Sequence, residues 1–159
     1  MATPTYVPLA TITLASTDSE IVFSSIPATY RDLILIVNAT NASTTPLKMQ
    51  FNGDTGNNYA KVIMGGTGST TLTISITEDG VRQGNIKSTL TQFSFQVFDY
   101  SLTDKHKSVL SRYDDSSNQV VAGAYRWANT AVITSVRFVP EAGSFAIGST
   151  FALYGSNKL

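Results

Sequence analysis

The chain has 159 residues, of which 42% are hydrophobic and 14% charged, and its formal net charge at pH 7 is zero. This length suits one domain with a sizeable core, and the neutral charge balance gives no electrostatic attraction to nucleic acid or to an anionic membrane. The chain lacks cysteine, which excludes disulfides, thiolate metal sites and cysteine nucleophiles. No apolar run approaches the length of a membrane-spanning helix, so we expect neither a nucleic-acid nor a membrane partner.

The first third of the sequence begins with two prolines in residues 1–8, which predict an extended N-terminal arm before a single sandwich domain over residues 9–159. Segment 9–15 alternates apolar and polar residues, a polar turn follows, and segment 21–23 is short and apolar. We expect these two segments to form a hairpin. Segment 33–37, Leu-Ile-Leu-Ile-Val, is apolar on both faces, which predicts a strand in the middle of a sheet.

The middle of the sequence continues with strand patterns. Segment 47–51 has one apolar and one polar face, and the turn-rich segment 52–58 separates it from a strand over 59–64, so we predict a hairpin with a long loop. Segment 71–77 has the most regular two-residue period, and its leucine and isoleucines are expected to point inward. Segment 90–98 adds a strand with alternating phenylalanines and valine.

The last third contains the clearest core candidates. Segment 108–113 fits neither a strand nor a helix period well, whereas segment 120–127 places Trp127 on the same side as three alternating partners. Phe151 and Leu153 are expected to point inward from the final strand. About ten to twelve strands at roughly ten-residue spacing, without a helical stripe, predict an all-β fold: a two-sheet antiparallel β-sandwich that is jelly-roll-like.

Four segments, taken in order along the chain, carry a resemblance. They are residues 26–33 (Ile-Pro-Ala-Thr-Tyr-Arg-Asp-Leu), 51–59 (Phe-Asn-Gly-Asp-Thr-Gly-Asn-Asn-Tyr), 133–136 (Ile-Thr-Ser-Val) and 148–155 (Gly-Ser-Thr-Phe-Ala-Leu-Tyr-Gly). This set resembles segments that recur together in small β-rich structural proteins of tailed bacteriophages, and the resemblance spans almost the whole chain.

The resemblance implies a virion component with a β-sandwich fold and no catalytic motif. Such proteins are free-standing virion proteins or end domains of tail fibres. Because the chain lacks a long N-terminal shaft or coiled coil, it looks more like a capsid decoration or cement protein, which would bind the major capsid protein or another virion protein at the capsid surface. The alternative is a tail-fibre or receptor-binding module that recognises host surface carbohydrate.

Catalytic and metal chemistry find little support in the residue pattern. His106 lies between two lysines in a charged segment, and no Gly-x-Ser-x-Gly motif is present, so we expect no enzyme activity and no cofactor. The segment 52–58 offers asparagine and aspartate oxygens to a cation such as Ca²⁺, but these residue types also form turns without a metal. We favour the structural interpretation, with Asp54 and His106 both in solvated loops.

Candidate partner-binding residues come from the arm and from aromatic residues beside turns. Trp127 is in phase with core residues and is expected to be buried, whereas two tyrosines that flank turns are expected to lie on the surface, where a sugar ring can stack on them. The candidates are Thr3, Pro4, Tyr6, Val7, Pro8, Tyr100 and Tyr113.

The low charge content also predicts self-association. Four apolar residues are expected on strand faces opposite the core: Ile34, Ile36, Ile133 and Val139. Such faces tend to be covered, and a trimer matches the threefold positions of a shell. We therefore expect a homotrimer whose arms hold a neighbouring virion protein.

Overall fold

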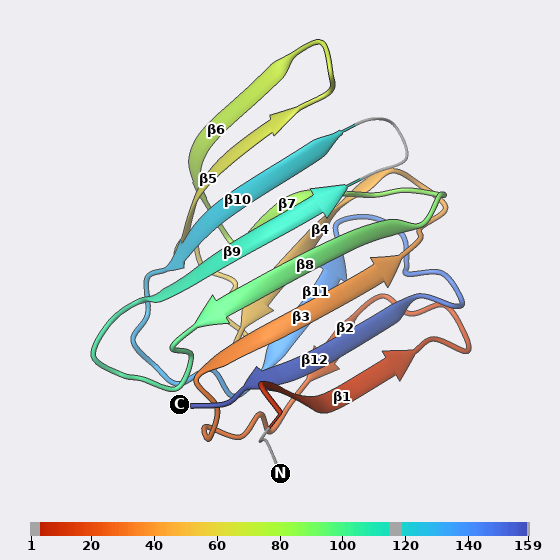
Figure 1. Ribbon diagram of the computed structural model, residues 1–159. Helices are drawn as coiled ribbons and strands as arrows, with labels where there is room; N and C mark the ends of the chain where they lie inside the picture. The colour runs from red at the N-terminus through yellow and green to blue at the C-terminus, as the bar shows by residue number, and fades with distance from the viewer. Residues whose placement is uncertain (1–3, 115–118, 159) are drawn as a thin grey trace.

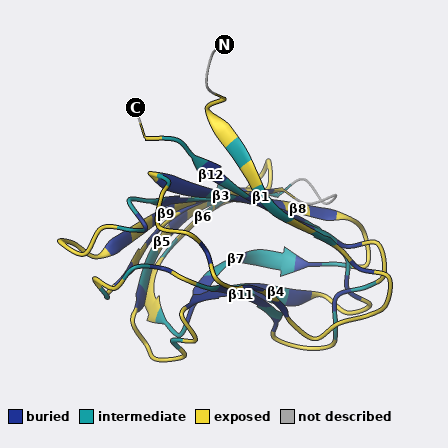
Figure 2. Cartoon of the chain, turned by 90° about the horizontal axis from the view of Figure 1, so that it is seen from below, coloured by how far each residue is buried: buried dark blue, intermediate teal, exposed yellow. Residues whose placement is uncertain are grey.

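The computed structural model describes residues 4–114 and 119–158. In this part of the chain the structure is all-β, and two antiparallel sheets pack face to face (Figures 1 and 2). The predicted β-sandwich fold class is thus confirmed. None of the described residues forms a helix of the length and apolar character needed to cross a membrane.

The larger sheet has eight strands in the order β1-β12-β3-β8-β9-β10-β5-β6. Segment 33–37 lies inside β3, in the interior of this sheet, as its doubly apolar pattern predicted. The strands are β1 (Tyr6–Thr13), β12 (Thr150–Ser156), β3 (Asp32–Ala39), β8 (Thr91–Phe98), β9 (Lys107–Asp114), β10 (Val120–Trp127), β5 (Tyr59–Gly66) and β6 (Thr71–Glu78).

The smaller sheet has four strands in the order β2-β11-β4-β7. They are β2 (Ile21–Phe23), β11 (Val136–Pro140), β4 (Thr45–Phe51) and β7 (Val81–Ile86). Because this sheet has half as many strands as the larger one, it covers only part of its inner face. Figure 1 shows the β5–β6 hairpin projecting past the end of the smaller sheet.

The core lies between the sheets and is rich in phenylalanine. The Phe151 ring lies 5.8 Å from the ring of Phe138 and 4.9 Å from that of Phe145, measured between centroids. Phe138 in turn lies 5.9 Å from Phe95 of the opposite sheet. Phe151 and Leu153 are both buried, which confirms their predicted inward orientation in the last strand.

The N-terminal segment differs from the prediction of an arm over residues 1–8. Strand β1 begins at Tyr6 and pairs with β12, so Tyr6, Val7 and Pro8 belong to the sheet and the arm prediction is wrong for them. Thr3 lies outside the described residues. Pro8 is tolerated because β1 is an edge strand and its register shifts directly after Pro8, so the missing N–H costs no regular ladder bond.

Two predicted hairpins are also wrong. β1 pairs with β12 in the larger sheet, whereas β2 pairs with β11 in the smaller one. Likewise β4 belongs to the smaller sheet and β5 to the larger, so segment 52–58 carries the chain from one sheet to the other. The reason is that turn residues reverse the chain without specifying which sheet the next strand joins.

One of the four apolar residues expected outside the core lies inside it. Ile133 is fully buried, and its N–H donates to the carbonyl of Tyr100 at 3.0 Å. It precedes β11 in a non-strand segment, where the two-residue period does not apply. Ile34, Ile36 and Val139 are half-buried.

Replacing Phe151 by Ala is expected to lower the free energy of unfolding by about 2–5 kcal/mol, because the cavity removes contacts with two other rings. Urea unfolding followed by fluorescence measures this change. Thr150→Ala in the same strand, at a half-buried outward position, is the matched control and should change stability by less than about 1 kcal/mol. Equal effects of both substitutions would contradict the assignment of Phe151 to the core.

Candidate binding face

The outward side of the larger sheet, here called the outer face, brings together apolar side chains from several strands. Ile34 of β3 pairs with Gln96 of β8, which pairs with Leu110 of β9. The same row continues through Ala124 of β10 to Val62 of β5. Because neighbours directly opposite in a sheet point to one side, these five side chains form a continuous row.

A second row lies two residues further along each strand. It runs from Ile36 through Ser94, Arg112 and Ala122 to Met64. Only Arg112 carries a charge among the ten residues of the two rows. The sequence predicted the outward positions of Ile34 and Ile36 but did not single out Val62, Met64 or Leu110.

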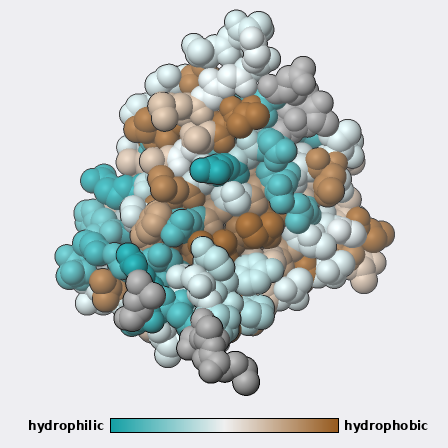
Figure 3. Space-filling model, in the orientation of Figure 1, coloured by the Kyte–Doolittle hydropathy of each residue, from teal (hydrophilic) through white to brown (hydrophobic). Residues whose placement is uncertain are grey.

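The apolar members of the two rows form what we call the apolar patch. All of them except Ile36 line a shallow hollow of about 440 Å³, which Arg112 and Gln96 also line. Met64 is 64% exposed, Leu110 52% and Val62 49%. Figure 3 looks onto this face and shows hydrophobic side chains gathered over the middle strands. The patch comprises Ile34, Ile36, Val62, Met64, Leu110, Ala122 and Ala124.

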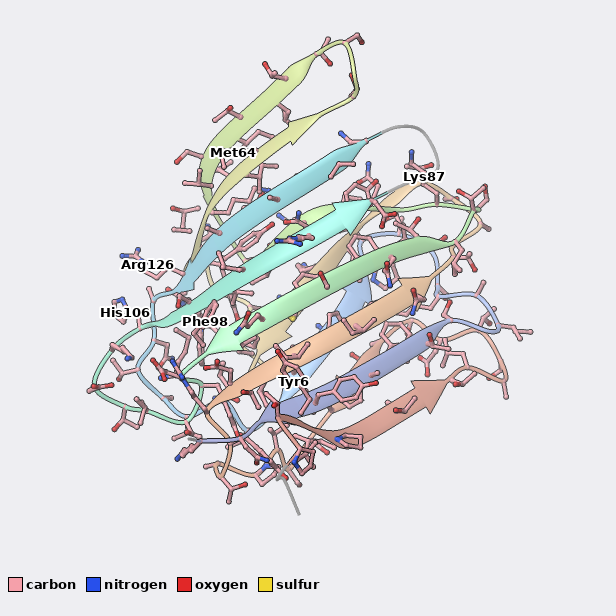
Figure 4. The ribbon with its side chains drawn as sticks, in the orientation of Figure 1. Tyr6, Met64, Lys87, Phe98, His106 and Arg126 are labelled. Carbon is pink, nitrogen blue, oxygen red and sulfur yellow. The ribbon has the colours of Figure 1, made fainter. Side chains whose placement is uncertain are left out.

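Some predicted partner-binding residues lie on this same outer face. Tyr6 is 58% exposed and Pro8 is also exposed, both at outward positions of β1. Pro8 pairs with Tyr154 of β12, and Tyr154 pairs with Ile34 of the apolar patch. Figure 4 shows Tyr6 near the β1 edge of the larger sheet and Met64 near its β6 edge. Val7 is half-buried, at an inward position.

The other two predicted surface tyrosines are buried, so the prediction of surface aromatics is wrong. Tyr100 is fully buried, and its hydroxyl donates to the carbonyl of Pro27. Tyr113 is in phase with inward residues of β9, and its ring stacks on Phe93 at 5.0 Å. Gly84 leaves room for the Tyr113 ring, since a Cβ there would lie 2.7 Å from it. A tyrosine beside a turn can reach a backbone acceptor from inside the core.

The loop 52–58 uses its polar groups within the protein. Trp127 Nε1 donates to Asp54 Oδ2 at 2.7 Å, and the N–H of Gly56 donates to Asp54 Oδ1 at 2.9 Å. The Asn58 amide donates to both carboxylate oxygens. Trp127 itself is buried, as predicted. These bonds agree with the structural interpretation of the loop, but Asp54 is half-buried and not the solvated residue that we expected.

The hydrogen bonds also set the ionisation of Asp54. Partial burial opposes the charged form, but the bonds from Trp127, Gly56 and Asn58 outweigh it, so the pKa of Asp54 lies below its ordinary value of 3.8. Among the described residues, no three histidine, cysteine, aspartate or glutamate side chains are grouped so that they could hold a metal ion.

Asn52, the first residue of this loop, binds it to a neighbouring segment of the chain. Its φ of 52° lies in the left-handed region, which asparagine adopts more readily than most residues. Its Oδ1 accepts from the N–H groups of Thr134 at 2.9 Å and Ser135 at 3.1 Å, and its Nδ2 donates to the carbonyl of Val132 at 2.8 Å. Asn52 therefore joins the loop to the segment that leads into β11.

The charged segment before β9 contains one exposed and one buried basic residue. His106 is exposed in the loop, as predicted, whereas the adjacent Lys107 is 1% exposed. Lys107 Nζ donates to the carbonyl of Thr130 at 2.9 Å, and also to those of Leu102 and Lys105. Burial lowers the pKa of Lys107. No sequence signal separated this lysine from its exposed neighbours.

No family model matches the chain, and no curated protein matches it. Among solved structures, the chain is similar to a tetrameric galectin from the ball sponge Cinachyrella sp., with a TM-score of 0.37 and 11% sequence identity. The alignment covers 86% of this chain and 99% of the galectin chain.

Asp54→Asn is expected to lower the free energy of unfolding at pH 7 by about 1–3 kcal/mol, because the indole and backbone donors lose a charged acceptor. The folded-state pKa lies below the unfolded value, so this contribution is complete above about pH 4 and is lost as the pH falls through the folded-state pKa. Urea unfolding at several pH values should therefore show wild type and variant converging at acid pH.

Asp104→Asn, in an exposed loop, is the matched control for this substitution. It should leave the free energy of unfolding within about 0.5 kcal/mol of wild type. A difference between wild type and Asp54→Asn that does not change with pH would refute the role of the ionised carboxylate.

Proposed function

We propose that this protein is a non-enzymatic structural protein of a tailed-bacteriophage virion, and that it decorates or cements the capsid by binding a shell protein through the outer face. The observation that supports binding by this face is the exposure of the apolar patch. The phage assignment and the location at the capsid surface come from the resemblance of the four sequence segments.

The energetic argument concerns three large side chains. Met64, Leu110 and Val62 each expose about half of their surface or more on one side of a rigid sheet. Complete burial of such a side chain contributes about 1.5–3 kcal/mol. Clustered exposure of this kind favours a protein partner, because single scattered apolar residues would gain much less from association.

The chemistry of the partner follows from the surroundings of the patch. The patch contains no charged residue, and Arg112 lies within the second row beside it. A matching surface would be apolar, with a carboxylate or carbonyl oxygen placed to accept from the guanidinium. A shell repeats such a surface many times, so many copies of this protein can bind one particle.

A second function is favoured by the polar and aromatic residues at the margin of the patch. Tyr154, Ile34 and Gln96 are consecutive in one row, with Tyr6 on the same face. Tyrosine rings stack on sugars, while the glutamine amide and Arg112 donate hydrogen bonds to hydroxyl groups. This arrangement supports the receptor-binding alternative, with host surface carbohydrate as the ligand.

Replacement of both Met64 and Leu110 by Lys is expected to weaken binding to shells that lack the protein by at least about tenfold, since one lost apolar contact is worth that factor. Co-sedimentation of purified protein with such shells measures the dissociation constant. Ile147→Lys is the matched control, because Ile147 is 65% exposed but lies in the loop before β12, outside the patch.

Failure of the wild-type protein to bind shells, or equal binding by the double variant, contradicts the shell-binding proposal. Binding of wild type to host polysaccharide, together with its loss in Tyr154→Ala, would support the receptor-binding alternative in its place.

A further inference from the structure

The two edges of the larger sheet are built differently. The β1 edge carries Pro8 and an interrupted register, both of which hinder pairing with another chain. At the opposite edge, strand β6 pairs with its neighbour β5 without interruption from Tyr59↔Glu78 to Gly66↔Thr71. Between Thr71 and Thr77 it contains no proline and no charged residue. The β6 edge therefore lacks the devices by which edge strands usually avoid pairing.

The direction of the free backbone groups of β6 follows from its turn. The N–H of Thr67 donates to the carbonyl of Thr70 at 3.1 Å, so this pair is hydrogen-bonded. Hydrogen-bonded and non-hydrogen-bonded pairs alternate along an antiparallel ladder. The backbone groups of four β6 residues consequently point away from β5, to the side on which no strand of the described residues pairs with β6: Thr71, Thr73, Ser75 and Thr77.

The inner side of β6 is also incompletely covered. Leu72 and Ile74 are half-buried, and Ile76 is 49% exposed, although all three point toward the side that the smaller sheet covers elsewhere. The predicted inward orientation of these residues is thus correct in direction, but no strand of the smaller sheet lies over them (Figure 1). A partner that extends the sheet at β6 would bury them.

We propose that the β6 edge pairs with the β6 edge of a second copy, antiparallel, around a two-fold axis at Ile74. Residues that face each other across an antiparallel pair lie on the same side of the sheet, so only registers that match inward with inward residues are allowed. With the axis at Ile74, Leu72 faces Ile76 of the second copy, and Thr73 faces Ser75 of the second copy.

This register is self-complementary, which is why a second copy fits the edge. Ile74 faces its own counterpart, so apolar residues meet apolar residues along the inner side. Moving the axis to Ser75 would place Leu72 opposite the charged Glu78 of the second copy. With the axis at Ile74, no two like charges face each other between Thr71 and Thr77, so nothing opposes the pairing electrostatically.

The pairing yields a dimer in which the two larger sheets continue into each other, with both apolar patches on the same side. An interface around a two-fold axis closes at two subunits. We therefore propose a dimer in place of the trimer expected from the sequence. The pairing does not depend on the proposed function, because it uses the sheet edge and the inner side of β6, not the outer face.

Cross-linking through an introduced cysteine tests the register. The chain contains no cysteine, so any disulfide in a single-cysteine variant joins two molecules. Ile74 would face its counterpart as a non-hydrogen-bonded pair with a Cα–Cα separation of about 4.5 Å, which suits a disulfide. Under glutathione disulfide, Ile74→Cys is expected to become mostly covalent dimer on a non-reducing gel.

The matched control is Ile76→Cys. In the proposed register Ile76 faces Leu72 of the second copy, so the cysteine introduced in the second copy would lie four residues further along its strand. Alone it should stay monomeric on the gel, whereas a mixture of Leu72→Cys and Ile76→Cys should give a mixed disulfide dimer. Equal cross-linking of Ile74→Cys and Ile76→Cys, or none in either, would overturn the proposed register.

Thr73→Pro tests the pairing without a cross-link. It removes an N–H that points away from β5, so the β5–β6 ladder keeps its bonds while the edge loses a donor. Sedimentation velocity of wild type at about 100 μM is expected to give twice the monomer mass, and the variant the monomer mass. Circular dichroism and the melting temperature check that the variant is folded.

If Thr73→Pro does not fold, Ile74→Lys serves the same purpose, because it places two like charges opposite each other at the axis. Ile147→Lys is its matched control and should remain dimeric. A wild-type protein that sediments as a monomer or a trimer, or variants that keep the wild-type mass, would contradict the pairing. These measurements use purified protein alone, so their failure is separate from a failure to bind shells.

Discussion

The sandwich depends on the corner at which the chain leaves the smaller sheet and enters the larger one. Phe51 ends β4, Tyr59 begins β5, and Trp127 ends β10, and the three rings lie within 6.2 Å of one another between centroids. The N–H of Phe51 donates to the Tyr59 hydroxyl at 3.0 Å. The indole of Trp127 donates to Asp54 in the loop between them. Apolar contact holds the two sheets together here, and the carboxylate fixes the path of the corner.

A second polar contact positions the sheets deeper in the core. The buried Gln83 of β7 crosses to the larger sheet, where its Nε2 donates to the carbonyl of Val121 at 2.9 Å and its Oε1 accepts from Ser111 at 2.5 Å and from Tyr125. Gly123 leaves space for it, since a Cβ there would lie 2.3 Å from Gln83 Oε1. Buried polar groups that are fully bonded favour one arrangement of a core. Gln83 therefore holds β9 and β10, which carry three of the seven residues of the apolar patch, from the inner side of the larger sheet.

The two-residue period was sufficient to find most strands and their inner faces, because alternation in strands such as β12 follows burial directly. It failed in β9, where Lys107 and Ser111 point inward and Leu110 points outward, so the polarity pattern is partly reversed. That reversal concealed Leu110 as a member of the apolar patch. The pattern of alternation also could not predict which strands pair, since β1 pairs with β12, which is far from it in the sequence. The surface position predicted for Tyr100 was wrong for a different reason: its hydroxyl donates to a backbone carbonyl inside the fold.

The place of β12 between β1 and β3 has a consequence for biosynthesis. The contact between Asn38 and Thr150 spans 112 residues of sequence, and β3 gains its second neighbour only when β12 arrives. Contacts of such long sequence separation make folding slow. During translation, the edges of β1 and β3 that flank β12 therefore stay unpaired until residues 150–156 have left the ribosome, so the larger sheet cannot be completed before then.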